Sequence, residues 1–283
     1  MCKFVSAIVT EDKIYFPLGG LGGDHKHTSI LFNHKIRDDI YSNHVEIEIL
    51  PIGKSLLSTN LKDWKMVIDT NDYSIPKWFN KKKQEVTEID AIYKVINMVK
   101  NFDGIFKYDL YCPNCSNLTE INSKVNKNLD CYMCPKLTEI NSKVNGYLDC
   151  SNCPNLTKIS GKVNGDLNSS NCSNLTEISG KVNGDLYCYN CPKLTKLPDK
   201  VKGNLDCSNC PNLTEINSEV NRNLNCYNCS NLTKLPDKVS RNLDCSYCPN
   251  LTKLPDKVNG DLNCYNCSKL TEKICYTGLI RIK

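Results

Sequence analysis

The chain has 283 residues with 36 basic and 31 acidic side chains, which leaves a net charge of only +5. This balance argues against a dedicated nucleic-acid-binding protein, in which a concentrated basic stripe is expected. Near the N-terminus, Glu11 and Asp12 interrupt a short apolar run, so the sequence predicts neither a secretory signal nor a membrane-spanning helix. We therefore expect a cytoplasmic protein whose 19 cysteines meet a reducing environment and need not form disulfides.

Residues 1–104 are not repetitive, and their patterns predict a small α+β domain. Two short apolar segments, Lys3–Thr10 and Lys13–Phe16, favour a hairpin, and Val45–Leu50 and Lys65–Asp69 favour two further strands. Apolar residues recur with helical spacing through Val86–Val99, which predicts a helix.

The same region shows no catalytic or cofactor motif. The glycines at positions 19–23 lack the Gly-Lys-Ser/Thr ending of a phosphate-binding loop. The four histidines, His25, His27, His34 and His44, follow no zinc-ligand spacing. We therefore expect neither enzyme activity nor a bound cofactor.

Residues 105–272 form the second predicted domain, in which a nineteen-residue block recurs nine times. Each copy begins with a leucine, at positions 110, 129, 148, 167, 186, 205, 224, 243 and 262. A repeat this short buries its apolar residues only by stacking on its neighbours, which predicts a solenoid. The expected fold is thus an α+β domain followed by a parallel-β solenoid of nine coils. Residues 273–283 depart from the pattern and predict a C-terminal cap.

Within one coil the apolar residues stand at fixed offsets. Leu205 and Cys207 are two residues apart, which sends both side chains to one face of a strand. Cys210, Leu213 and Ile216 follow at intervals of three, which favours a turning, 3₁₀-like return rather than a second strand.

This pattern resembles the leucine-rich repeat L-x-x-L-x-L-x-x-(N/C)-x-L, with Leu129, Cys131, Cys134 and Leu137 in the strand and ladder positions. It departs from that family in its short period, in the cysteine that replaces a strand leucine, and in one extra residue before Leu137. The opening MCKFVSAIV, the strand VEIEILP and the stretch WKMVIDTNDYSIPKWF resemble the start of uncharacterised bacteriophage repeat proteins. That resemblance implies a viral or prophage accessory protein in the host cytoplasm, and it implies no catalytic residue.

Eight copies carry a C-x-x-C pair, and consecutive pairs are fifteen residues apart, which is a zinc-like spacing. A strict repeat gives its cysteines this spacing whatever their role. Cysteine is also a small residue that is typically buried. Ser169 replaces one of these cysteines, which packing tolerates and a four-cysteine zinc site does not. We favour inward packing, with a zinc-binding or redox module as the alternative.

Stacking of the coils should align the residues between the inward positions into columns. The column after each leucine and the column after each first cysteine contain Asp, Asn, Ser and Tyr, a combination common in binding surfaces. The candidate partner-binding residues are Asp130, Tyr132, Asp149, Tyr187, Tyr189, Asp206, Tyr227, Asp244 and Tyr265.

Two other columns carry most of the remaining charge. One contains Lys124, Lys143, Lys162, Lys181, Lys200, Glu219, Lys238 and Lys257, and the other mixes Glu and Lys from Glu120 to Glu272. We interpret the lysine column as a solvated edge and the mixed column as structural, because its neighbouring charges can pair across coils. The predicted function is a non-enzymatic module that presents its Asp/Tyr face to a host or defence protein with a basic surface, away from membranes.

Overall fold

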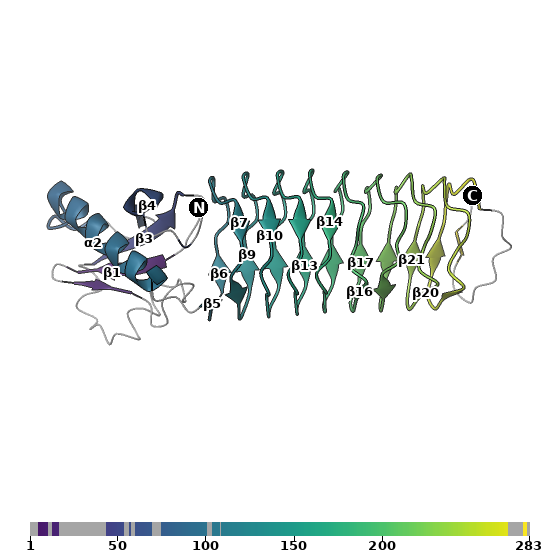
Figure 1. Ribbon diagram of the computed structural model, residues 1–283, viewed down its shortest axis with the longest axis horizontal. Coiled ribbons are helices and arrows are strands. Elements are labelled where there is room, and N and C mark those ends of the chain that lie inside the picture. The colour runs from purple at the N-terminus through teal and green to yellow at the C-terminus, as the bar shows by residue number, and fades with distance from the viewer. Residues whose placement is uncertain are drawn as a thin grey trace.

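The computed structural model describes residues 5–10, 13–16, 44–53, 57, 60–69, 75–100, 104–107, 109–270 and 280–281. A small sheet and one long helix lie at one end of a stack of coils that runs to the C-terminal part of the chain (Figure 1). The predicted α+β region followed by a parallel-β solenoid is therefore confirmed.

The N-terminal sheet is antiparallel and has the strand order β2-β1-β3-β4. Its strands are β1 (Val5–Val9), β2 (Ile14–Tyr15), β3 (Val45–Pro51) and β4 (Trp64–Asp69), with a 3₁₀ turn η2 (Leu61–Asp63) before β4. The predicted hairpin and both predicted strands are confirmed.

Helix α2 (Lys81–Lys100) is longer than the predicted segment. It begins after Asn80, whose side chain accepts a hydrogen bond from the backbone N–H of Lys83 at 3.1 Å. Its C-terminal half buries Ala91, Ile92, Val95, Ile96 and Val99. Val86 and Ile89, which helical spacing assigned to the same face, are instead exposed, because other residues face the sheet in this half of the helix. Thr87 is buried there, and the Glu88 side chain accepts the backbone N–H of Met66 at 3.0 Å.

The main sheet of the solenoid is parallel, and leucine stacks on leucine along it. Leu129 pairs with Leu148 and Asp130 with Asp149, and the same register repeats along the stack. In chain order the strands are β6 (Leu110–Tyr111), β9 (Leu129–Asp130), β11 (Leu148–Asp149), β13 (Leu167–Asn168), β15 (Leu186–Tyr187), β17 (Leu205–Asp206), β19 (Leu224–Asn225), β21 (Leu243–Asp244), β23 (Leu262–Asn263) and β24 (Ile280–Arg281).

The predicted strandless return is wrong for the coils that form a second parallel sheet, and a third set of parallel strands follows it in the coil. The second sheet contains β7 (Glu120–Ile121), β10 (Glu139–Ile140), β12 (Lys158–Ile159) and β14 (Glu177–Ile178). The third face contains β5 (Ile105–Phe106) paired with β8 (Lys124–Val125), and then β16 (Lys200–Val201), β18 (Glu219–Val220), β20 (Lys238–Val239) and β22 (Lys257–Val258). Isolated bridges from Val125 to Val201 connect these two groups of strands.

The second sheet ends where proline enters the repeat. Asn141 donates its backbone N–H to the carbonyl of Ile121 at 3.0 Å, and Ser179 repeats this bond to Ile159 at 2.9 Å. Pro198 occupies the same position in the next coil and has no N–H to donate. The ladder therefore ends after β14, although the coil itself continues.

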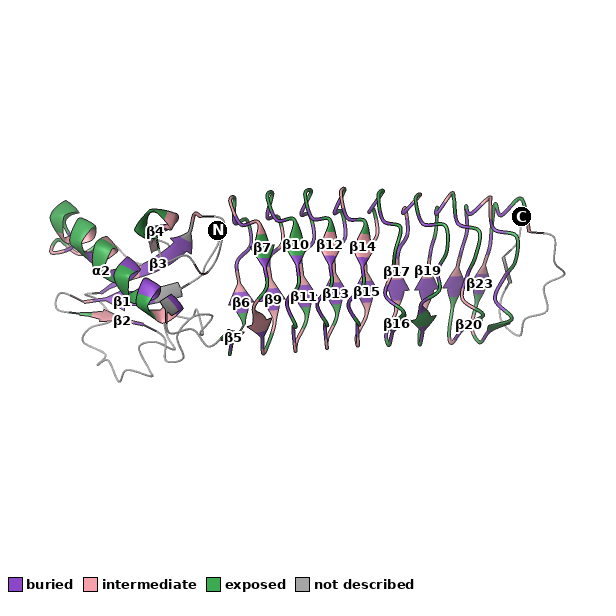
Figure 2. Ribbon diagram, in the orientation of Figure 1, coloured by how far each residue is buried: buried purple, intermediate pink, exposed green. Residues whose placement is uncertain are grey.

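Each coil points its apolar side chains into the interior, where they are buried along the stack (Figure 2). In the coil that begins at Leu205, the inward residues are Leu205, Cys207, Cys210, Leu213, Ile216 and Val220, as the repeat predicts. Close packing extends to the backbone: a side-chain carbon at Gly161 would collide with the carbonyl oxygen of Ser142 in the preceding coil.

The described part of the predicted cap adds one more strand to the stack. β24 pairs in parallel with β23, with Ile280 opposite Leu262. The rest of residues 273–283, like the glycine cluster and His25, His27 and His34, lies outside the described residues. His44 is buried and lies 3.5 Å from Glu46.

Candidate functional site

The outer face of the main sheet has three columns of side chains, which we name by their position in the coil. The pre-leucine column contains Asp109, Asn128, Tyr147, Asp166, Asp185, Asn204, Asn223, Asn242 and Asp261. The post-leucine column contains Tyr111, Asp130, Asp149, Asn168, Tyr187, Asp206, Asn225, Asp244 and Asn263. The post-cysteine column contains Pro113, Tyr132, Ser151, Ser170, Tyr189, Ser208, Tyr227, Ser246 and Tyr265. All nine candidate residues lie in the last two columns.

Asp and Asn in the pre-leucine column connect one coil to the next. The Asp185 carboxylate accepts the backbone N–H of Asn204 at 2.7 Å, and the Asn204 side chain accepts that of Asn223 at 3.1 Å. Both residue types provide the acceptor oxygen that this position needs. The sequence interpretation missed this column, although its two-residue spacing from the post-leucine column places it on the same face.

Five Asp and Asn residues of the post-leucine column each close a turn inside their own coil. Asp206 Oδ1 accepts the backbone N–H of Ser208 at 3.0 Å and its hydroxyl at 2.7 Å. Asn168 Oδ1 accepts the same two bonds from the backbone N–H and the hydroxyl of Ser170, at 3.2 and 2.6 Å. These are Asx turns, which either side chain can form. This hydrogen bond therefore needs an acceptor oxygen and does not need a negative charge.

The post-cysteine column is not uniformly outward, which corrects the sequence interpretation. Its serines are buried, because they lie against the Asx turns: Ser170 is 1% exposed and Ser246 2%. Its tyrosines are larger and extend beyond the turn, and Tyr227 and Tyr265 are exposed. Tyrosine rather than serine is thus the part of this column that a partner could contact.

Carboxylates on adjacent coils perturb each other. Burial, together with the neighbouring Asp149 and Asp109, raises the pKa of Asp130, although a hydrogen bond from the Tyr147 hydroxyl at 2.5 Å opposes this shift. Burial also disfavours the charge of Asp185, but hydrogen bonds from Asn204 and Tyr187 outweigh it, so that the pKa of Asp185 is lowered. The acidic face thus contains at least one carboxylate whose charge the fold disfavours.

The tyrosines interact with one another at both ends of the face. Tyr111 and Tyr132 share a hydroxyl contact of 3.1 Å, which together with burial raises the pKa of Tyr111 to about 12. Near the other end, the rings of Tyr227, Tyr247 and Tyr265 lie next to one another. These aromatic side chains are held in place by their neighbours.

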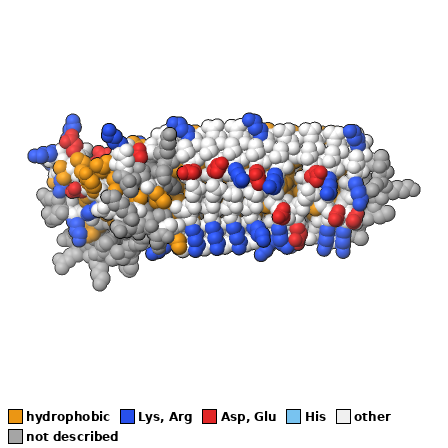
Figure 3. All heavy atoms as spheres, viewed as in Figure 1, with side chains coloured by type: hydrophobic (Ala, Val, Ile, Leu, Met, Phe, Trp, Pro, Cys, Tyr) orange, Lys and Arg blue, Asp and Glu red, His pale blue; other side chains and the backbone are white. Residues whose placement is uncertain are grey.

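No lysine or arginine occurs in the three columns between residues 109 and 265. Lys127, Arg222 and Arg241 border the face, one position before the pre-leucine column. Figure 3 shows a different side of the solenoid, with a row of red and blue side chains along its middle and a blue row along its lower edge. Basic and acidic side chains pair across coils in that mixed column, as in Lys196 with Glu177 at 2.8 Å. The three columns of the outer face therefore carry carboxylates and no basic side chain of their own.

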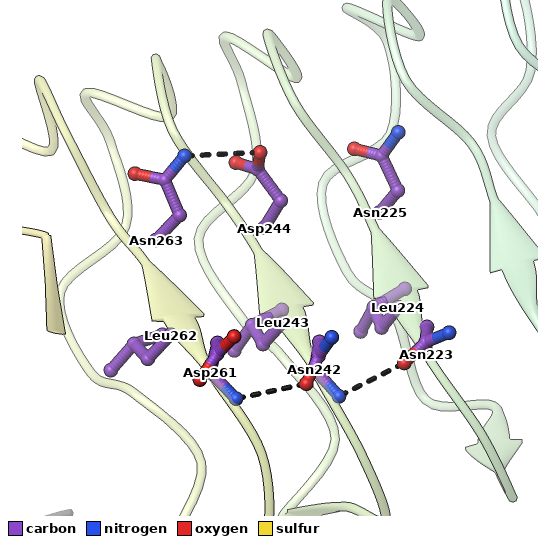
Figure 4. Close-up of a pocket in the computed structure, with 9 residues that line it drawn as sticks. All are labelled: Asn223, Leu224, Asn225, Asn242, Leu243, Asp244, Asp261, Leu262 and Asn263. Atoms are coloured by element: carbon purple, nitrogen blue, oxygen red, sulfur yellow. Dashed lines mark hydrogen bonds between the residues drawn. The ribbon is translucent and has the colours of Figure 1, made fainter. Parts of the chain in front are cut away.

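A shallow groove of about 380 Å³ lies on this face near its C-terminal end. Its lining includes pre-leucine and post-leucine residues of three coils, and the backbone at the leucines forms its floor (Figure 4). Asp244 Oδ2 accepts a hydrogen bond from the Asn263 amide at 3.1 Å, so the rim is held in a fixed arrangement.

The cysteines are interior packing groups rather than an exposed site. Among the described residues, every cysteine except Cys115 is a free thiol buried in the core. The Cys153 thiol donates to the carbonyl of Cys131 at 3.3 Å, and the Cys172 thiol donates to that of Cys150 at 3.2 Å. Burial raises the pKa of Cys131 and Cys150, which keeps these thiols neutral.

Ser169 shows how a cysteine position accepts a hydroxyl. Its Oγ donates to the carbonyl of Tyr187 at 3.4 Å, as the Cys150 thiol does to that of Asn168 at 3.4 Å. Within the described part of the chain, no group of three or more His, Cys, Asp or Glu side chains is arranged to hold a metal ion.

Comparison with models of known protein families and with curated proteins finds no match to this chain. In the parts of the chain that the structure describes, no helix has the length and apolar character needed to cross a membrane.

Proposed function

We propose that the protein is a non-enzymatic binding module whose main-sheet outer face binds a basic segment of a partner protein. The observation that carries this proposal is that Asp recurs at positions where Asn makes the same bonds to the backbone. Asn168 closes the same turn as Asp206, and Asn204 makes the same coil-to-coil bond as Asp185. The negative charge is therefore surplus to these backbone bonds.

That surplus charge costs stability where carboxylates adjoin. Asp130 and Asp149 stand on paired positions of adjacent strands, and burial and this like charge raise the pKa of Asp130. A basic partner would relieve the repulsion on binding, and Tyr side chains would add rigid contact area. The face extends over nine coils, or roughly 40 Å at the usual spacing between strands. An extended segment of about twelve residues would span it.

The N-terminal resemblance to bacteriophage repeat proteins supports a viral or prophage accessory protein that acts on a host or defence protein in the cytoplasm. A reducing compartment would keep the buried thiols free. The proposal does not depend on that source, since it rests on the chemistry of the face.

The experiment uses the full chain and a fluorescein-labelled twelve-residue peptide of alternating Arg and Gly. The variant changes Asp130, Asp149, Asp206 and Asp244 to Asn, which keeps one acceptor oxygen at each position and removes four charges. Measured by fluorescence anisotropy at low salt, the affinity should fall about tenfold or more, since each exposed ion pair contributes roughly 0.2–1 kcal/mol.

The matched control changes Glu120, Glu139, Glu177 and Glu215 to Gln, which removes the same number of charges from the mixed column. This control should keep the wild-type affinity within about twofold, because its charges lie on another face. Equal losses in the two variants, or no loss in either, would refute a binding site on the outer face.

A further inference from the structure

Three tyrosines form an exposed cluster beside the groove. Tyr227 and Tyr265 belong to the post-cysteine column, and Tyr247 follows that column in the coil between them. The ring centroids of Tyr227 and Tyr247 are 5.2 Å apart, and those of Tyr247 and Tyr265 are 5.6 Å apart. The planes are inclined at 62° and 58°. The residues are 38%, 41% and 37% exposed, so each ring contacts its neighbour and also faces solvent.

Tyr247 occupies a backbone position that does not favour tyrosine. The residue at this position has a positive φ in all nine coils, between 55° and 59°. Asparagine fills it in every coil except those with Met133 and Tyr247, as expected for a left-handed conformation that asparagine tolerates best.

The asparagines at this position also support each other, and Tyr247 ends that support. Asn209 donates its side-chain amide to Asn190 at 2.9 Å, and Asn228 donates to Asn209 at 2.9 Å. Tyrosine at position 247 cannot continue this ladder. The local conformation and hydrogen bonding thus both favour Asn, which points to a role for the Tyr247 ring outside the coil.

The surroundings of the cluster favour a cation. Asp244 lies three residues before Tyr247, and its column neighbours Asn225 and Asn263 each lie two residues before the other two tyrosines. Ser246 donates to Asp244 Oδ1 through both its backbone N–H, at 2.9 Å, and its hydroxyl, at 2.7 Å, which fixes the carboxylate. The nearest arginine along the chain, Arg241, is six residues from Tyr247.

We propose that Tyr227, Tyr247 and Tyr265 form an aromatic platform that binds the cationic side chain, above all the guanidinium, of a basic polypeptide segment. The positive charge lies over an exposed tyrosine face, which attracts cations through the ring quadrupole, and Asp244 supplies the compensating negative charge. Arginine suits this platform better than lysine because its planar group also stacks on aromatic rings. The inference rests on the proposed function and names the anchor within that face.

The test uses full-length Tyr247→Asn, which places the prevailing residue of the column at position 247. Its affinity for the Arg-Gly peptide should fall about fivefold, the size of a moderate cation–π contribution. Its thermal unfolding midpoint should equal or exceed that of the wild type, since the asparagine ladder is extended. Tyr247→Phe should keep the affinity within about twofold, because the aromatic face remains.

Two controls make the result specific. Met133→Asn changes the other residue that replaces asparagine at this backbone position, outside the cluster, and it should bind the peptide as the wild type does. A peptide with citrulline in place of arginine has the same shape without the charge, and it should lose most of its affinity.

The outcomes distinguish a failure of the tyrosine platform from a failure of the whole binding face. Unchanged peptide affinity in Tyr247→Asn would overturn the platform, as would equal binding of the citrulline peptide. If that variant binds normally while the four Asp-to-Asn changes abolish binding, the acidic face stands without this anchor. If neither variant weakens binding, the proposed function itself fails.

Discussion

At the scale of single residues, the outer face shows how an aspartate can accept a structural hydrogen bond and also add negative charge to the surface. Asp206 and Asn168 close the same turn with the same bonds to serine. Where this position holds Asp or Asn, the side-chain oxygen that accepts the serine bonds is what the two residues share. Each aspartate adds a negative charge to the outer face at that position. This distinction makes Asp-to-Asn substitution the appropriate probe.

Asp130→Asn should raise the stability of the protein at neutral pH. Burial and the nearby Asp149 and Asp109 raise the pKa of Asp130 in the folded chain, so the folded state holds its proton more tightly than the unfolded state. Such a group stabilises the fold below its unfolded pKa, and that contribution is lost as the pH rises through the folded pKa. Asn keeps the acceptor oxygen without the charge.

Thermal unfolding followed by circular dichroism at pH 7 and near pH 3.5 checks this. The variant should unfold at a higher temperature than the wild type at pH 7, and the difference should shrink at the lower pH. Asp206→Asn is the control, because its column neighbours are Tyr187 and Asn225 rather than carboxylates. A larger gain for the control than for Asp130→Asn would contradict this account.

At the scale of elements, each coil combines very short strands with a compact interior. Two-residue strands have little stability alone, so the ladders persist because each coil stacks its inward side chains on the next. Cysteine fits this interior since it is small and apolar, and its thiol donates to carbonyls that the turns leave available. The zinc-like spacing follows from the repeat.

Cys150→Ser should be well tolerated, and Cys150→Leu should not. Ser169 already makes the bond that Cys150 makes, so the serine variant should lose less than about 1 kcal/mol of unfolding free energy. Leucine overfills the coil and should cost about 1–3 kcal/mol. Urea denaturation measures both values, with a chelator added in parallel. A collapse of the serine variant, or a loss of stability on chelation, would favour the zinc-binding alternative.

At the scale of the whole molecule, the solenoid is a one-dimensional array with a folded domain at its N-terminal end. The two parts share one apolar core, and the Asn117 amide donates to the carbonyl of Ile52 at 2.6 Å across their boundary. Because each coil contacts chiefly its neighbours, stability is distributed along the stack and the outer face grows with coil number.

Excision of one complete coil, residues 148–166, should leave a folded and shorter solenoid. The cut joins coils with equivalent residues, so that Leu129 meets Leu167 and Ile140 meets Ile178. We expect a cooperative urea transition whose denaturant dependence falls by roughly a tenth, in line with the surface removed. Excision of only residues 148–157 breaks the period and should abolish that transition. Similar behaviour of the two deletions would argue against an array of equivalent coils.

The repeat by itself determined the solenoid, its inward residues and most of the candidate face. A fixed period without insertions aligns every position with its counterpart, so Leu205, Cys207 and Val220 could be assigned to the core from spacing alone. The N-terminal strands and helix were predictable because alternation and helical spacing of apolar residues are local properties of the chain. The sequence does not identify a partner, because the repeat determines only the packing of the coils and the side chains that the surface presents.

Only the tertiary structure decided how the coil closes and what each outward residue does. The second and third sheets arise from bonds between coils nineteen residues apart, and their two-residue strands leave no local alternation to detect. Ser170 and Ser246 are buried because Asx turns fold over them, and Val86 and Ile89 are exposed because Thr87 and Glu88 face the sheet in that half of α2. Sequence periodicity specifies which side chains share a column, whereas burial, hydrogen bonding and charge in that column depend on the neighbouring coils.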